Sequence, residues 1–236
     1  MSQKNRGKHP NDDKLFGKKW SLNFKEAVKD LSFLLTRGYG SKSATELVGN
    51  RYRLNSRQQK ALTRMSAATQ NLQIRKDKEQ TATQLTDQTV LIDGFNLLIL
   101  LESILSDAFI FKSQDGNYRD LASVHGSYRR VSQTEEAIIL AGNVLKGLGV
   151  KKVIWYFDSP VSNSGRMKSM LLDLSTQHDF EWEVHLSNNP DMELVKSPHI
   201  AITSDAWILD ECAQWFNFGA YLIEHHLQPK FIVAAD

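Results

Sequence analysis

The stretch Thr89-Val-Leu-Ile-Asp-Gly-Phe-Asn96 combines a short run of strand-forming residues with an aspartate and a glycine at its end. An apolar run bounded by a turn signal is typical of a buried strand. Two later segments have the same form, Lys152-Val-Ile-Trp-Tyr-Phe-Asp158 and Ile200-Ala-Ile-Thr-Ser-Asp205. In an open parallel sheet, the ends of such strands lie side by side along one edge. The three segments therefore predict that their final aspartates converge.

Strand-like and helix-like segments alternate from residue 89 to the end of the chain. Helices are expected at about 96–107, 133–146, 164–177 and 206–217, and further strands at about 181–186, 220–223 and 231–234. Residues 108–121 are expected to form a short hairpin around Asp115-Gly-Asn117. The alternation predicts right-handed crossovers and a parallel sheet with helices on both faces. The expected fold class is α/β with a Rossmann-like sheet, preceded by a small all-α domain.

Most of the positive charge lies in the first 80 residues. They hold 18 Lys and Arg against 7 Asp and Glu, a balance of +11, whereas the remainder holds 11 against 20, a balance of −9. A basic region joined to an acidic one suggests that the first binds a polyanion and that the second contains a cation-binding pocket. The basic residues that follow the second expected helix or lie on the third are candidates for contact with a nucleic-acid backbone: Arg51, Arg53, Arg57, Lys60 and Arg64. The alternative is that they are only the solvent-exposed residues of ordinary helices.

Apolar spacing from residue 15 predicts three short helices in a small bundle that resembles a helix-turn-helix. Ser41 or Ser43 is the expected N-cap of the second helix, and Asn55 or Ser56 that of the third. The expected domains are a disordered basic arm (1–14), a basic helical bundle (15–70), a helical or flexible linker (71–88) and an α/β domain (89–236).

Clustered carboxylates suggest a particular chemistry. Without cysteine or histidine partners they suit a hard divalent cation such as Mg²⁺ or Mn²⁺. The single cysteine, Cys212, excludes a disulfide framework or a cysteine-rich zinc site. Each aspartate also has a local alternative, because Asp93 precedes a glycine as turn residues do and Asp205 stands where an N-cap would. Asp210, in the helix expected after Asp205, is a candidate accessory ligand. Metal-assisted phosphodiester hydrolysis is the first hypothesis.

Several polar residues are candidates for placing a phosphate. Arg166 and Lys168 stand near the start of an expected helix, where cations oppose the helix dipole and so indicate a nearby anion. Asn96 is placed to orient the Asp93 carboxylate or to contact a phosphate. Residues 109–130 look like an insertion, in which His125 and Arg129 either bind substrate or only decorate a hairpin.

The ordered set Asp93-Gly-Phe-Asn96, Phe157-Asp158 and Thr203-Ser-Asp205 resembles the PIN-like nucleases, particularly their NYN branch, over about residues 88–236. The chain is also similar to an uncharacterised prokaryotic family that joins a basic helical domain to such a fold. The resemblance implies a metal-dependent endoribonuclease in which Asp93, Asp158 and Asp205 hold Mg²⁺ or Mn²⁺. This group usually adds an acidic residue from a helix, and the candidates that remain open are Glu102, Glu135 and Glu136.

Two other functions remain as alternatives. One is a non-catalytic PIN-like module that binds RNA or a protein, and the other is a phosphohydrolase acting on small phosphoesters. Phosphate-loop and dinucleotide-binding fingerprints are absent from the sequence. No apolar run approaches the roughly 18 residues of a membrane helix. We expect a cytoplasmic protein whose partner is nucleic acid, with RNA favoured over DNA, and whose association as a homodimer stays open.

Overall fold

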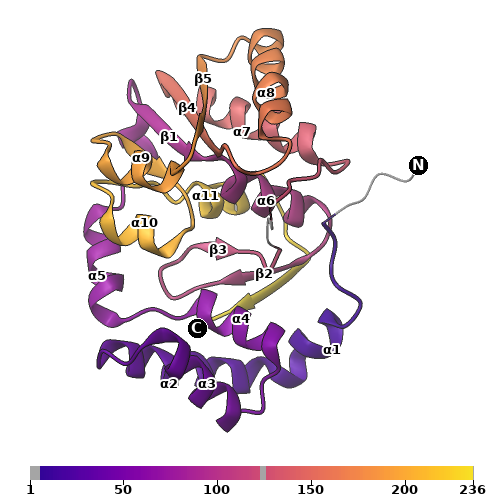
Figure 1. The fold of residues 1–236 in the computed structure, drawn as a ribbon, viewed down its shortest axis with the longest axis vertical. Helices are drawn as coiled ribbons and strands as arrows, with labels where there is room; N and C mark the ends of the chain where they lie inside the picture. The colour runs from indigo at the N-terminus through magenta and orange to yellow at the C-terminus, as the bar shows by residue number, and fades with distance from the viewer. Residues whose placement is uncertain (1–5, 123–125, 236) are drawn as a thin grey trace.

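The computed structural model describes residues 6–122 and 126–235 and contains two sheets (Figure 1). The larger sheet has the order β5-β4-β1-β6, with all neighbours parallel. Its strands are β1 (Thr89–Asp93), β4 (Lys152–Asp158), β5 (Trp182–Ser187) and β6 (Ile200–Ile202). The α/β class, the parallel sheet and the three aspartate-terminated segments predicted from the sequence are confirmed.

Helices cover both faces of this sheet. One face carries α6 (Gly94–Leu105), α7 (Thr134–Gly147) and α8 (Ser164–His178), and the other carries α9 (Pro190–Lys196) and α10 (Ala206–Glu211). Val90 and Ile92 belong to the hydrophobic core on the face of α6, α7 and α8, whereas Leu91 belongs to the core on the face of α9 and α10. Successive side chains of a strand point to opposite faces, and both faces of this sheet are covered by helices. This is why β1 is apolar at three consecutive positions.

A second sheet has the order β3-β2-β7. The strands β2 (Phe109–Lys112) and β3 (Tyr118–Arg119) form the predicted hairpin, and β7 (Phe231–Ala234) runs parallel to β2. The strand predicted at 220–223 is wrong, because these residues lie in α11 (Phe218–His225). The side chain of Asn217 accepts a hydrogen bond from the N–H of Ala220 and so starts that helix, and the helix predicted to reach residue 217 ends at Glu211.

The N-terminal part is helical, as predicted. Its α-helices are α1 (Asp12–Phe16), α2 (Ser21–Thr36), α3 (Ser41–Arg51), α4 (Ser56–Met65) and α5 (Thr69–Lys78), and 3₁₀ turns occupy η1 (Lys18–Trp20) and η2 (Ala82–Leu85). Asn55 caps α4 in a capping box with Gln58, but the residue before α3 is Gly40 and not either serine. None of the helices in the described ranges has the length and apolar character that a membrane crossing requires.

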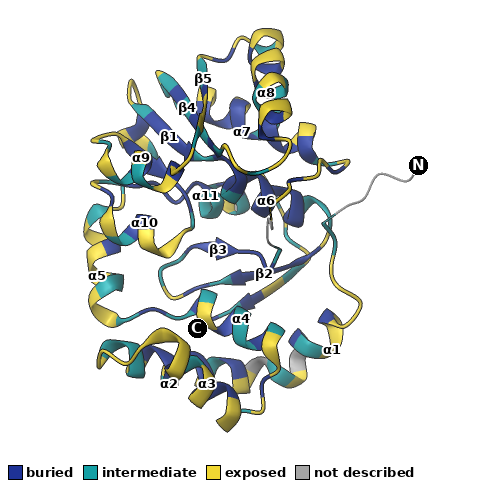
Figure 2. Cartoon of the chain, viewed as in Figure 1, coloured by how far each residue is buried: buried dark blue, intermediate teal, exposed yellow. Residues whose placement is uncertain are grey.

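Helices α1 to α4 share one core with the second sheet, and their inward faces are buried (Figure 2). The Phe16 and Phe111 rings meet edge to face with centroids 4.8 Å apart, and Val233 of β7 joins the same cluster. Helix α5 lies in the region expected to be a linker. It packs against the part of the molecule that contains the larger sheet, because the indole N–H of Trp215 donates to the carbonyl of Arg75 at 2.8 Å. The helical part therefore packs against strands contributed by the C-terminal two-thirds of the chain.

Gly94 is required by packing at the start of α6. A Cβ at this position would lie 2.4 Å from the Phe157 ring, which is fully buried and stacks on Trp155. Gly94→Ala is therefore expected to lower the free energy of unfolding by roughly 1–3 kcal/mol, as measured by urea unfolding. Gly147→Ala is the control, because nothing lies within 4 Å of its added Cβ. Equal stability of the two variants would contradict this packing.

Candidate active site

Every strand of the larger sheet is followed by an aspartate at its carboxyl edge. Asp93 and Asp158 end β1 and β4, Asp205 precedes α10 just after β6, and Asp191 lies in the first turn of α9 after β5. The four side chains thus come from neighbouring strand ends (Figure 1). This is the edge at which open parallel sheets bind ligands.

Asp191 was missed by the sequence interpretation. It lies four residues beyond the last residue of β5, so it does not terminate an apolar run as the other aspartates do. The available signal was Asn189-Pro190, because asparagine at the N-cap and proline at N1 mark a helix start. The side chain of Asn189 does accept a hydrogen bond from the N–H of Met192 at 3.3 Å.

Asp93 is the most strongly perturbed of the four. Burial, opposed by hydrogen bonds from Thr203 and the Asn96 backbone and helped by the charges of Asp191 and Asp205, raises the pKa of its carboxyl group to about 7. The Thr203 hydroxyl donates to Oδ2 of Asp93 at 2.9 Å and accepts the N–H of Asp205 at 3.0 Å. Thr203 therefore ties the end of β1 to the segment that carries Asp205.

Asp191 connects the four aspartates electrostatically. Burial raises its pKa first, followed by the charges of Asp205 and Asp158, and burial also raises the pKa of Asp158. In the part of the chain that the structure describes, no lysine, arginine or histidine forms a salt bridge with any of these aspartates. The edge therefore carries negative charge that no described cation pairs with.

The aspartates share an edge but not a coordination sphere. Within residues 6–122 and 126–235, no three His, Cys, Asp or Glu side chains are grouped closely enough to hold a metal ion. Oδ1 of Asp205 accepts the N–H groups of Trp207 at 2.9 Å and Ile208 at 3.2 Å, so this carboxylate has the capping role that was its local alternative. Metal binding by Asp93, Asp158 and Asp205 stays a prediction.

Three of the phosphate candidates lie near the start of helices that follow strands of this sheet. Oδ1 of Asn96 accepts both the N–H and the hydroxyl of Ser204 at 2.9 Å, which fastens α6 to the segment after β6. Arg166 is exposed and Lys168 is half-buried in the first turns of α8, the helix that follows Asp158. Among the described ion pairs, none involves either residue. Arg129 is exposed.

The structure does not bring the accessory acids to this edge. Asp210 faces α5, where Arg75 and Asn71 each bind its carboxylate at 2.7 Å. Glu102 is fully buried and is bound by Arg6, Tyr128 and Thr134. Two further candidates, Glu135 and Glu136, are exposed at the start of α7 and are not among the charges that raise the aspartates' pKa values.

Most of the five basic residues expected to contact a nucleic-acid backbone make contacts inside the chain instead. Arg57 pairs with the buried Asp12 at 2.6 and 2.9 Å. Lys60 donates to the carbonyl of Leu121 at 3.1 Å, and Arg64 donates to the carbonyl of Asp120. The other two are more open, since Arg51 lies 3.3 Å from Asp30 with an exposed side chain and Arg53 is exposed in a left-handed conformation. His125 lies outside the described residues.

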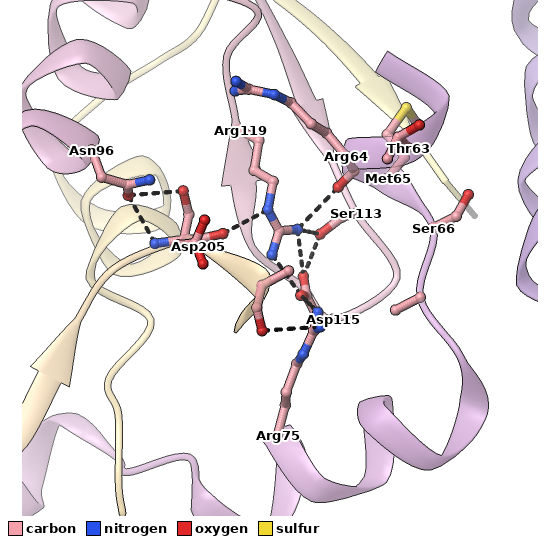
Figure 3. A pocket seen from close by; sticks show the side chains of 13 residues that line it. Thr63, Arg64, Met65, Ser66, Arg75, Asn96, Ser113, Asp115, Arg119 and Asp205 are labelled. Atoms are coloured by element: carbon pink, nitrogen blue, oxygen red, sulfur yellow. Dashed lines mark hydrogen bonds and ion pairs between the residues drawn. The ribbon is translucent and has the colours of Figure 1, made fainter. Parts of the chain in front are cut away.

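A cavity of about 210 Å³ lies beside the aspartate edge (Figure 3). Residues 63–67, which end α4 and lead into α5, form one wall, and the turn between β2 and β3 forms another. Asn96 and Asp205 line the side nearest the sheet, and the guanidinium groups of Arg75 and Arg119 meet at Asp115. The helical part of the chain thus contributes directly to the surroundings of Asp205.

Stability should depend on pH through Asp93. Its pKa is about 7 in the folded state, whereas an unfolded aspartate titrates near about 3.9. Between these values the folded state binds a proton that the unfolded state lacks, so the free energy of unfolding decreases as pH rises from about 4 to about 7 and then levels off. Urea unfolding in EDTA at several pH values measures this decrease. A decrease as large in Asp93→Asn as in the unsubstituted protein would contradict the assignment.

Comparison with known proteins places the chain in a family. Residues 82–221 match the family described as "Domain of unknown function (DUF5616)", and residues 23–78 match "Protein of unknown function (DUF434)". The chain is 31% identical over 188 residues to "Uncharacterized protein MJ0935" of Methanocaldococcus jannaschii, covering 80% of this chain and 89% of that protein. No solved structure matches. The chain therefore belongs to the DUF5616 family.

Proposed function

We propose that the protein hydrolyses phosphodiester bonds of RNA at the carboxyl edge of the larger sheet, with Mg²⁺ or Mn²⁺ as cofactor. The observation that carries this proposal is the set of four aspartates at neighbouring strand ends. Burial and then the charges of neighbouring aspartates raise the pKa values of Asp93 and Asp191, and no described cation pairs with any of the four. Bringing two carboxylates to within 4 Å of each other, as a shared ion requires, costs about 4 kcal/mol at an effective dielectric constant near 20. A bound divalent cation relieves this repulsion.

The strand order supports a PIN-like fold of the NYN type. The order β5-β4-β1-β6 puts β1 in the interior and brings Asp93 between the strands that lead to Asp158 and Asp205. The resemblance in sequence covers the same three aspartates. We therefore assign the proposed chemistry to this fold and to RNA as its substrate.

The donor chemistry fits a hard cation. Asp93 with Asp191 and Asp205 would hold the ion and Asp158 would complete the acidic edge, because all four offer only oxygen atoms. Their present side-chain conformations form no ligand set in the described residues, so binding requires the carboxylates to turn toward a common point. When bound, such an ion supplies positive charge and lowers the pKa of a water molecule. Arg166 and Lys168 bind the phosphate, and Asn96 holds the Ser204 segment.

The test is cleavage of a labelled single-stranded RNA by the purified full chain. We expect cleavage with Mn²⁺, none in EDTA, and a loss of about 100-fold or more in the Asp93→Asn, Asp205→Asn double variant. Asparagine is also a good N-cap, so the second substitution keeps the start of α10. Unchanged cleavage in the double variant would refute the assignment of the site.

A second candidate is an RNA-binding module without catalysis. It is favoured by the finding that no three potential metal-binding side chains are grouped in the described residues. In the same assay this function gives RNA binding that is independent of Mn²⁺ and leaves the RNA intact. Hydrolysis of p-nitrophenyl phosphate without cleavage of RNA would instead indicate a phosphohydrolase of small esters.

A further inference from the structure

Two arginines from outside the larger sheet bind the peptide carbonyls on either side of Asp205. Nε of Arg119 donates to the carbonyl oxygen of Ser204 at 2.7 Å, and Nη2 of Arg75 donates to that of Ala206 at 3.3 Å. Both side chains are almost fully buried, with 7% and 5% of their surface exposed. The backbone is therefore fixed at the residue before the aspartate and at the residue after it.

Asp115 joins the two arginines (Figure 3). Its Oδ2 accepts from Nη2 of Arg119 at 2.7 Å and also from Arg75, and its Oδ1 accepts from Nη1 of Arg119 at 2.9 Å. Burial alone would raise the pKa of Asp115, but Arg119, then Ser113 and Arg75, hold it well below its usual range. The carboxylate is thus charged and keeps both guanidinium groups in one place.

The arginines belong to elements that are themselves anchored. Arg75 lies in α5, where Asp210 of α10 accepts from its Nε at 2.7 Å. Arg119 lies in β3 and also donates to the carbonyl of Arg64 at the end of α4. The conformation of the segment 204–206 is therefore determined by α5 and the hairpin as well as by β6.

We propose that Arg75 and Arg119 are positioning residues that hold the backbone from which the Asp205 carboxylate reaches the aspartate edge. This inference rests on the proposed function, because it assigns the helical region a role in the same metal site. Ligand side chains must be held within about 0.5 Å of their working geometry. Outer partners of metal ligands typically change metal affinity by about 10- to 100-fold when they are lost.

The test compares Arg119→Lys with Arg57→Lys in the full chain. Lysine keeps the charge but cannot bind Asp115 and the Ser204 carbonyl together, because it lacks the planar fork of arginine. Arg57 offers a matched control, since it makes a similar two-bond pair with buried Asp12 but forms no hydrogen bond or ion pair with residues 204–206 in the described structure. Arg75→Lys is the second test variant, in case Arg119→Lys does not fold.

Two measurements are made on each variant. We expect amide hydrogen exchange of Trp207 and Ile208, in metal-free protein, to be about tenfold faster in Arg119→Lys, and the dissociation constant for Mn²⁺ to rise about tenfold. Arg57→Lys should change neither, even where it lowers the melting temperature as much. Arg119→Lys values equal to those of Arg57→Lys would overturn the positioning role. Absence of Mn²⁺ binding in the unsubstituted protein would refute the proposed function instead, and the exchange rates would still decide whether the arginines hold the segment.

Discussion

Asp115→Asn is expected to lower the free energy of unfolding by about 3–5 kcal/mol, because it leaves two buried arginines without their shared carboxylate. The Asp115 side chain is 2% exposed and interacts with both Arg75 and Arg119. Asparagine has the same shape, so the loss reports charge and hydrogen bonding and not volume. Urea unfolding monitored by circular dichroism at pH 7 measures it.

The pH dependence of this effect has a definite sign. The pKa of Asp115 is lower in the folded state than in the unfolded state, so its stabilisation is present above about pH 4 and is lost as pH falls. The control is Asp179→Asn, because Asp179 pairs with Lys146 at 3.1 Å but is 93% exposed. It should change stability by less than about 0.5 kcal/mol. Equal effects of the two substitutions would show that the network around Asp115 does not stabilise the fold.

Asp93→Asn is expected to have opposite effects on activity and on stability. Cleavage of RNA with Mn²⁺ should fall by about 10²- to 10⁴-fold, since a carboxylate central to the site is removed. The metal-free protein should become more stable at pH 8 by about 1–2 kcal/mol, because a neutral amide replaces a charge that burial and two neighbouring aspartates disfavour. The same protein preparations serve for cleavage assays and for urea unfolding in EDTA.

Asp173→Asn is the matched control for this substitution. Asp173 is exposed on α8, and none of the described ion pairs involves it. It should leave both cleavage and stability unchanged. A fall in the stability of Asp93→Asn at pH 8 would mean that the Asp93 carboxylate stabilises the metal-free fold, contrary to the electrostatic account of the edge.

The strand ends were predictable from sequence because their signals are local. An apolar run that leads to an aspartate is visible within seven residues of sequence, and β1, β4 and β6 all lie in such segments. Asp191 was not found because α9 begins after a short connection that separates it from β5. The apolar residues 220–223 were misassigned to a strand, since a short apolar run fits either a strand or a buried helix.

The partners of charged side chains were not predictable, because they come from distant parts of the chain. Asp210 pairs with Arg75, which is 135 positions away, and Arg57 pairs with Asp12, which is 45 positions away. The sequence shows that α4 is basic but not that Lys60 and Arg64 face the segment 120–122. Tertiary packing decides whether a basic helix has free charges.

A manganese-soaked crystal tests the central claim most directly. We predict an anomalous density peak at the carboxyl edge of the larger sheet, about 2.1 Å from a carboxylate oxygen of Asp93, with the side chains of Asp191 and Asp205 turned toward it. Manganese density elsewhere in the crystal with none near Asp93 would contradict the claim that this edge holds a divalent cation.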